Sequence, residues 1–213
     1  GSTACTSSNT NGSSGEFALM IEETFVTHIG VDESGKGDFF GPLVIAGVMV
    51  DEKAAKIFEE LRIRDSKKIT DGRILKLEPI IKENAPYSVI AISNGKYNEL
   101  YGNMKNLNKL LAWGHARTIE NILEKNECGY AISDKFGNDH FIQDALMKKG
   151  QQIKLDQMVR GESDIAVAAA SILARAAFVH KIKEMQEAYG IEFPKGCAPQ
   201  VKECAREFIA KYG

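Results

Sequence analysis

The chain has 213 residues and a mass of 23.4 kDa, which is enough for one domain with a buried core of useful size. With 44% apolar and 26% charged residues and a net charge of −2, the composition excludes disorder over most of the length and the broad basic surface of a histone-like protein. We find no continuous apolar run of the roughly 18–20 residues that a membrane span needs, so no membrane association is expected.

The first twenty residues differ in composition from the rest of the chain. Residues 1–15 contain no large apolar side chain and are dominated by Ser, Thr, Asn and Gly, so they cannot bury enough surface to order themselves. We therefore expect residues 1–20 to be a disordered leader or an added tag, and residues 21–213 to form the domain. The four cysteines have no CxxC spacing and indicate neither a disulfide framework nor a zinc site, so a reducing cytoplasm is the expected location.

The hydrophobic pattern from residue 22 onward predicts five strands and six helices. Alternating residues or short apolar runs predict strands at 25–31, 43–50, 87–92, 129–133 and 153–159. Helical periodicity predicts helices at 54–61, 75–83, 106–125, 139–150, 163–189 and 199–212, with Asp139 and Ser163 as N-caps and Gly150 at an end. Strands come first and then alternate with helices, so the expected fold class is α/β, one mixed sheet covered by helices on both faces.

Two adjacent acids, Asp32 and Glu33, end the first strand and face a loop that contains Gly35, Gly37 and Gly41. Sites in α/β sheets form at the carboxyl ends of strands. Burying two neighbouring carboxylates is costly unless a cation neutralises them. The pair therefore indicates a cation site, with a simple polar turn as the alternative.

The same segment, GVDESGKG at 30–37, comes close to the phosphate-binding pattern GxxxxGK[ST]. Gly37 stands where the pattern needs a hydroxyl, and the two acids would repel phosphate. A strand is predicted after the loop, whereas a phosphate-binding loop needs a helix there. We therefore reject a phosphate-binding loop.

Further acids occur at two other junctions between elements. Asp134 follows an apolar strand, and Glu162 and Asp164 stand at the start of the alanine-rich helix. Each has an ordinary alternative, because Asp is a common turn former and acids favour helix starts. Together, however, three acidic points at junctions of one sheet indicate a site with hard oxygen ligands, which suits Mg²⁺ or Mn²⁺ better than Zn²⁺. The four histidines are scattered, and the sequence indicates no Ser-His-Asp arrangement.

A basic loop at 62–68 carries Arg62, Arg64, Lys67 and Lys68 against the single acid Asp65. Such a run is commonly a solvated surface. Beside a metal–carboxylate site it would also suit a polyanionic backbone.

Six blocks of sequence, in this order, resemble the type 2 ribonuclease H family, and within it ribonuclease HIII. The blocks are VDESGKGDFFGPLVIAG, DSKK, NLNKLLAWGHA, ISDKFG, GESDIAVAAASILAR and FPKGCAPQV. The resemblance runs from about residue 29 to residue 201. It implies a ribonuclease H-like fold with a mixed five-stranded sheet and extra C-terminal helices. It also implies an endonuclease that hydrolyses the RNA strand of RNA–DNA hybrids with divalent metal, leaving 3′-hydroxyl and 5′-phosphate ends.

The resemblance also implies roles for particular residues. The family's acids, taken as catalytic residues and as ligands of two Mg²⁺ or Mn²⁺ ions, fall on Asp32, Glu33, Asp134 and Glu162. The spacing after Glu162 is one residue shorter than in some relatives, which keeps Asp164 as a substitute. The family's loop for the ribose 2′-hydroxyl falls on Gly35-Lys36-Gly37, next to Ser34, and Lys67 and Lys68 are expected to contact substrate phosphates.

Two departures from the family pattern limit the expected activity. Many ribonucleases HIII carry an N-terminal hybrid-binding domain that resembles the TATA-binding fold, and residues 1–27 are too short for it, so we expect it to be absent. No equivalent is found of the tyrosine that ribonucleases HII use at a single embedded ribonucleotide. Activity of that type, a non-catalytic nucleic-acid-binding module and a nuclease acting on DNA alone are the alternatives. The expected partner is hybrid nucleic acid, and a monomer is expected.

Overall fold

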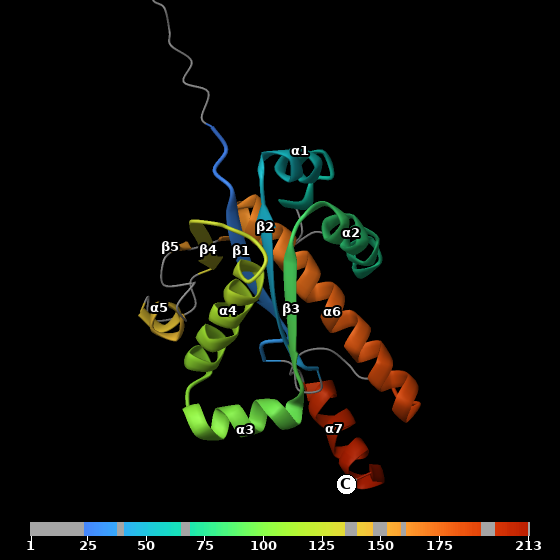
Figure 1. Ribbon diagram of the computed structural model, residues 1–213. Helices are drawn as coiled ribbons and strands as arrows, with labels where there is room; N and C mark the ends of the chain where they lie inside the picture. The colour runs from blue at the N-terminus through green and yellow to red at the C-terminus, as the bar shows by residue number, and fades with distance from the viewer. Residues whose placement is uncertain are drawn as a thin grey trace, which may run out of the picture.

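The computed structural model describes residues 24–37, 41–64, 69–134, 140–146, 153–158, 161–192 and 199–212. The described chain forms one five-stranded sheet with the strand order β3-β2-β1-β4-β5 (Figure 1). Antiparallel pairing joins β1 to β2 and β2 to β3, whereas β1, β4 and β5 pair in parallel. The strands are β1 (His28–Ser34), β2 (Leu43–Val50), β3 (Tyr87–Ile92), β4 (Tyr130–Asp134) and β5 (Lys154–Met158). This arrangement confirms the predicted mixed α/β sheet.

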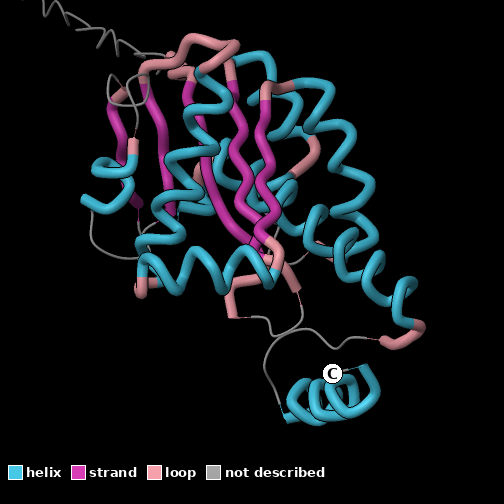
Figure 2. The backbone as a smooth tube through the Cα atoms, turned by 60° about the horizontal axis from the view of Figure 1, so that its bottom comes forward, coloured by secondary structure: helices cyan, strands magenta, loops and turns pink. Residues whose placement is uncertain are grey.

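Helices cover both faces of the sheet because its central strands are apolar on both sides (Figure 2). In β2, Val44, Ala46 and Val48 pack with residues of α1, α2 and α6 on one face, whereas Leu43 and Ile45 pack with α4 on the other. The helices are α1 (Glu52–Glu60), α2 (Asp71–Asn84), α3 (Asn94–Met104), α4 (Leu107–Leu123), α5 (His140–Ala145), α6 (Ile165–Tyr189) and α7 (Pro199–Tyr212). Two separate apolar layers therefore hold the sheet between them.

Helix α6 lies unusually close to β1. A Cβ at Gly30 would lie 2.1 Å from the backbone nitrogen of Val167, so only glycine permits this contact. By length and composition alone this 25-residue helix could span a membrane, because it contains an apolar window of 18 residues. That window is 67% buried inside the protein, and burial against the sheet accounts for its apolar composition.

All five predicted strands are present, the first starting at His28, three residues later than predicted. The sequence prediction missed α3, which begins at the N-cap Ser93. Its residues include Gly95 and Gly102 and none is buried, so neither propensity nor a strong apolar face marks it. The predicted cap of α6 was also wrong, since Asp164 takes that position in place of Ser163.

Some predictions fall outside the described residues. These are the leader at 1–20, the Asp139 cap and the Gly150 helix end.

Candidate active site

The parallel pairing of β1 with β4 brings two of the predicted acids together. Val31 lies opposite Ser133, so Asp32 and Asp134 are the next residues along neighbouring strands. Side chains alternate between the faces of a strand, and Gly30 faces α6, so Asp32 faces α6 as well. The preceding residue, Ser133, contacts His115 of α4 on the other face of the sheet. Asp134 therefore shares the α6 face with Asp32. The two carboxylates are therefore side by side on one face, at an edge where the end of β3 and the start of β2 also meet.

Glu162 reaches this place through a short turn, the 3₁₀ helix Gly161–Ser163. The Gly161 N–H donates to Asp134 Oδ1 at 2.8 Å. This bond ties the turn that carries Glu162 to the end of β4. The backbone thus brings the fourth predicted acid to the same sheet edge, although its side chain lies outside the described part of the structure.

The possible metal-ligand atoms among the described residues are hard carboxylate oxygens, which suit Mg²⁺ or Mn²⁺. Asp32 Oδ1 accepts a hydrogen bond from the Glu33 N–H at 2.8 Å, as Asp134 Oδ1 does from Gly161, so both side chains are oriented by backbone groups. Among the described residues, no three His, Cys, Asp or Glu side chains already converge as a metal site. The assignment of the four acids as ligands stays a prediction.

Glu33 follows Asp32 at the end of β1, and its side chain contacts both His115 of α4 and Asp32. The Nε2–H of His115 donates to Glu33 Oε2 at 2.9 Å, and His115 Nδ1 is hydrogen-bonded to Ser133 Oγ at 3.0 Å. Burial by itself would raise the pKa of the Glu33 carboxyl, but the hydrogen bond and charge of His115, together with Lys36, outweigh it and lower that pKa. Glu33 is therefore held as a carboxylate.

The contact with His115 was not foreseen from the sequence. The sequence feature that could have indicated it is a histidine within the apolar face of the helix predicted at 106–125. His115 lies one turn from Leu111 and Ile119, which pack against the sheet.

The glycine loop after β1 has backbone angles that favour glycine. Gly35 and Gly37 have φ values of 86° and 84°, in the left-handed region. A Cβ at Gly35 would also lie 2.2 Å from the carbonyl oxygen of Pro42. The next regular element is β2, not a helix, which agrees with the rejection of a phosphate-binding loop. Lys36 between the glycines is exposed, in reach of a ligand from solvent.

A pocket of about 310 Å³ lies between the end of β1, α2 and α6 and is lined in part by Glu33, Ser34 and Arg175. The Nε–H of Arg175 donates to a carboxylate oxygen of Asp71, on α2, at 3.1 Å. Sequence reasoning missed this cation, although it stands in the SILAR block. The predicted phosphate-binding residues Lys67 and Lys68 lie outside the described residues.

Asp164 has a different role from the other acids. Its Oδ1 accepts hydrogen bonds from the N–H groups of Ala166 and Val167, which caps α6. Its Oδ2 lies 2.7 Å from Nε2 of His28, whose Nδ1 lies 2.6 Å from the carbonyl oxygen of Val26. Asp164 is thus engaged in capping and in a mostly buried pair. This engagement favours Glu162 over Asp164 as the fourth acid.

The His28–Asp164 pair predicts how stability depends on pH. Burial lowers the pKa of His28, but the hydrogen bond and charge of Asp164 and the Val26 carbonyl outweigh burial and raise that pKa above 6.5. The stabilisation is complete below the unfolded pKa, roughly 6.5, and is lost as the pH rises through the higher folded value. We expect His28→Gln to lower the free energy of unfolding by about 1.5–3 kcal/mol at pH 6 and by less at pH 8.5.

Thermal or urea unfolding at the two pH values measures this difference. The control is His180→Gln, since His180 and its partner Glu78 form a more exposed pair that should contribute little. An equal loss at both pH values for His28→Gln would show that the histidine acts through packing alone.

A five-stranded mixed sheet of order β3-β2-β1-β4-β5, with acids at the ends of its central parallel strands, is the arrangement of the ribonuclease H-like fold. A sequence profile of the ribonuclease HII family matches residues 29–213. The chain belongs to this family. Among its relatives, ribonuclease HIII of Protochlamydia amoebophila is 43% identical over 186 residues, which cover 87% of this chain and 62% of the relative. Ribonuclease HIII of Chlamydia pneumoniae is 45% identical over 197 residues, which cover 91% of this chain and 66% of the relative.

Solved structures give the same result. The crystal structure of Bst-RNase HIII in complex with Mn²⁺ superposes with a TM-score of 0.82 at 30% identity, covering 90% of this chain and 64% of that one. RNase HII of Archaeoglobus fulgidus, solved in a complex with PCNA, gives a TM-score of 0.75 at 26% identity, covering 87% and 90%. The predicted resemblance to ribonuclease HIII is confirmed. The chain spans about two thirds or less of the length of the ribonuclease HIII relatives described above.

Proposed function

We propose that this chain is the catalytic part of a metal-dependent endonuclease that hydrolyses the RNA strand of RNA–DNA hybrids. The observation that carries the proposal is the placement of Asp32 and Asp134 side by side, with the turn of Glu162 bonded to Asp134. The family membership and the Mn²⁺ complex of Bst-RNase HIII support it. A nucleic-acid-binding module without catalysis would gain nothing from acids, which repel phosphate.

The proposal gives separate roles to the acids and to the glycine loop. Asp32, Glu33, Asp134 and Glu162 would hold two divalent ions, Mg²⁺ or Mn²⁺. When bound, such ions supply an activated water and stabilise the phosphate and the leaving 3′-oxygen, giving 3′-hydroxyl and 5′-phosphate ends. The loop of Gly35, Lys36 and Gly37, beside Ser34, is exposed at Lys36 and Gly37 and would present backbone groups to the ribose, because the absence of a Cβ at Gly37 permits close approach. The 2′-hydroxyl separates RNA from DNA, so selectivity for RNA would arise there.

A cleavage assay with three substrates tests the proposal. A labelled RNA–DNA hybrid, a DNA duplex with one embedded ribonucleotide and a DNA duplex are each incubated with Mg²⁺, Mn²⁺ or EDTA. We expect cleavage of the hybrid with metal, no cleavage in EDTA, and fragments whose 3′ ends a polymerase extends. Cleavage in EDTA would contradict the metal-dependent reaction, and cleavage of the DNA duplex would contradict the selectivity. Preferred cleavage at the single ribonucleotide would favour ribonuclease HII-type activity.

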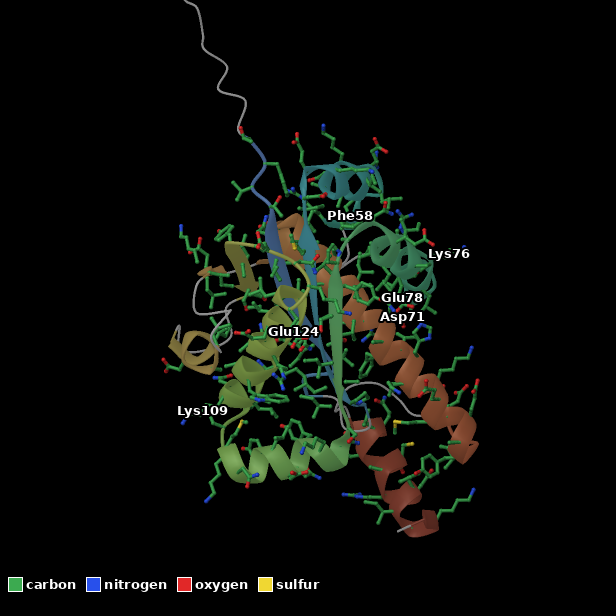
Figure 3. All side chains as sticks on the ribbon, viewed as in Figure 1. Phe58, Asp71, Lys76, Glu78, Lys109 and Glu124 are labelled. Carbon is green, nitrogen blue, oxygen red and sulfur yellow. The ribbon has the colours of Figure 1, made fainter. Side chains whose placement is uncertain are left out.

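The basic loop gives a separate prediction. If Lys67 and Lys68 bind substrate phosphates, replacing either by Ala should raise KM several-fold and leave kcat nearly unchanged, because uniform binding is lost. Each lost phosphate contact should also flatten the dependence of log affinity on log salt by about one unit. Lys76, on the outer side of α2 (Figure 3), provides the control variant Lys76→Ala. A fall in kcat alone, with the salt dependence unchanged, would assign the lysine to the chemical step.

The proposal also covers the cellular location and the oligomeric state of the protein. Within the described part of the chain, Cys128 and Cys204 are free thiols, which supports a reducing compartment and thus the cytoplasm. We propose a monomer, which sedimentation at micromolar concentration tests.

A further inference from the structure

His115 is fully buried in the middle of α4, and both of its ring nitrogens are bonded to groups of the sheet. One nitrogen bonds Ser133 of β4 and the other bonds Glu33 of β1. Each partner is next in sequence to one of the two acids that lie side by side, since Ser133 precedes Asp134 and Glu33 follows Asp32. A single side chain from outside the sheet therefore joins the two strand ends that carry the acids.

The Ser133–His115–Glu33 chain of hydrogen bonds is not a nucleophilic triad. The side chain of Ser133 is fully buried, and its Oγ lies 3.0 Å from both the carbonyl oxygen of Asp134 and Nδ1 of His115. A serine without access to solvent cannot attack a substrate. The bonds run along the sheet edge, from the backbone of Asp134 through Ser133 and His115 to the carboxylate of Glu33.

This connection has a consequence for Glu33. A glutamate side chain has three rotatable bonds, and holding its carboxylate in one place costs conformational entropy. The bond from His115 Nε2 fixes Oε2 before any ligand arrives, and the bond at Nδ1 fixes the ring. Groups that hydrogen-bond to a metal ligand without touching the metal orient that ligand. Their loss typically weakens metal affinity by roughly 10–100-fold.

We propose that His115 is a positioning residue that orients Glu33 for metal binding, with Ser133 holding the ring. The inference rests on the proposed function, because it takes Glu33 as a metal ligand. It extends that function because metal affinity would then depend on His115, a buried residue of α4 that acts on the metal site through Glu33. A residue needed for packing alone would change stability and leave metal affinity as it was.

The test measures Mn²⁺ binding directly, by calorimetric titration of the full chain without substrate, alongside thermal unfolding in EDTA. We expect His115→Leu to weaken Mn²⁺ binding by roughly 10–100-fold. We expect a smaller loss for Ser133→Ala, which removes the bond at Nδ1. His115→Gln can still donate to Glu33 and should recover part of the affinity. The same order should appear in the Mg²⁺ concentration that gives half-maximal cleavage of a hybrid.

The matched control is Thr118→Val on the same helix. Thr118 is also fully buried and polar, but its hydroxyl donates to the carbonyl oxygen of Gly114, away from the acids. This variant should lose stability and keep wild-type Mn²⁺ affinity. If His115→Leu does not fold, Ser133→Ala and His115→Gln carry the test.

The outcomes separate the inference from the proposed function. Mn²⁺ affinities within twofold of wild type in all folded His115 and Ser133 variants would overturn the inference and leave the nuclease assignment intact. A wild-type chain that binds no Mn²⁺ and cleaves no hybrid would overturn both.

Discussion

Replacing Asp134 by Asn should reduce cleavage of an RNA–DNA hybrid by at least about two to three orders of magnitude, as expected when a charge that stabilises the transition state is removed. The amide keeps the size of the side chain and can still accept the hydrogen bond of the Gly161 N–H. It removes the charge that a divalent ion needs. Thermal stability should stay equal or rise, because Asp134 and Asp32 no longer repel each other on the shared face of the sheet.

Asp32→Asn should behave in the same way, since Asp32 occupies the matching place on β1. The matched control is Asp144→Asn, which removes the charge of an exposed acid on α5 and should leave cleavage unchanged. Steady-state cleavage at saturating Mg²⁺, with unfolding curves in EDTA, makes the comparison. Near-wild-type cleavage by either site variant would remove that residue from the site.

The sheet could be predicted because its strands carry their own signals. Residues 43–50 are apolar without interruption, as a strand buried on both faces must be, and the structure packs alternate residues of β2 against different helices. Asp32 and Asp134 could be predicted to lie close together because each ends a strand, and parallel neighbours end at one edge. The sequence could not tell which acids share a face, since that depends on the register between β1 and β4.

The roles of His115 and His28 could not be predicted, because they depend on contacts between residues distant in the sequence. His115 is 82 positions from Glu33, and His28 is 136 positions from Asp164, so no local pattern links either pair. Helix α3 escaped for the opposite reason, because its local signals are weak. Its clearest signal, the cap at Ser93, is no stronger than that of an ordinary turn. The functional consequences of both histidines follow only from the tertiary structure.

The assignment of the fourth acid predicts opposite effects for two acids that are two residues apart. Glu162→Gln should reduce hybrid cleavage by orders of magnitude and leave stability nearly unchanged. Asp164→Asn keeps an acceptor for the N-terminal amides of α6 but loses the charge that faces His28. We expect it to lower the free energy of unfolding by about 1.5–3 kcal/mol at pH 6, while cleavage at 25 °C stays close to wild type.

The double variant His28→Gln/Asp164→Asn checks the cause of the stability loss. If the pair is responsible, the two losses should not add, because each single change already breaks the same interaction. Losses that add fully would mean that Asp164 stabilises the chain through the cap alone. An inactive Asp164→Asn together with an active Glu162→Gln would move the fourth ligand to Asp164. The chain would then have to release the cap of α6 and the bond to His28 whenever a metal ion binds.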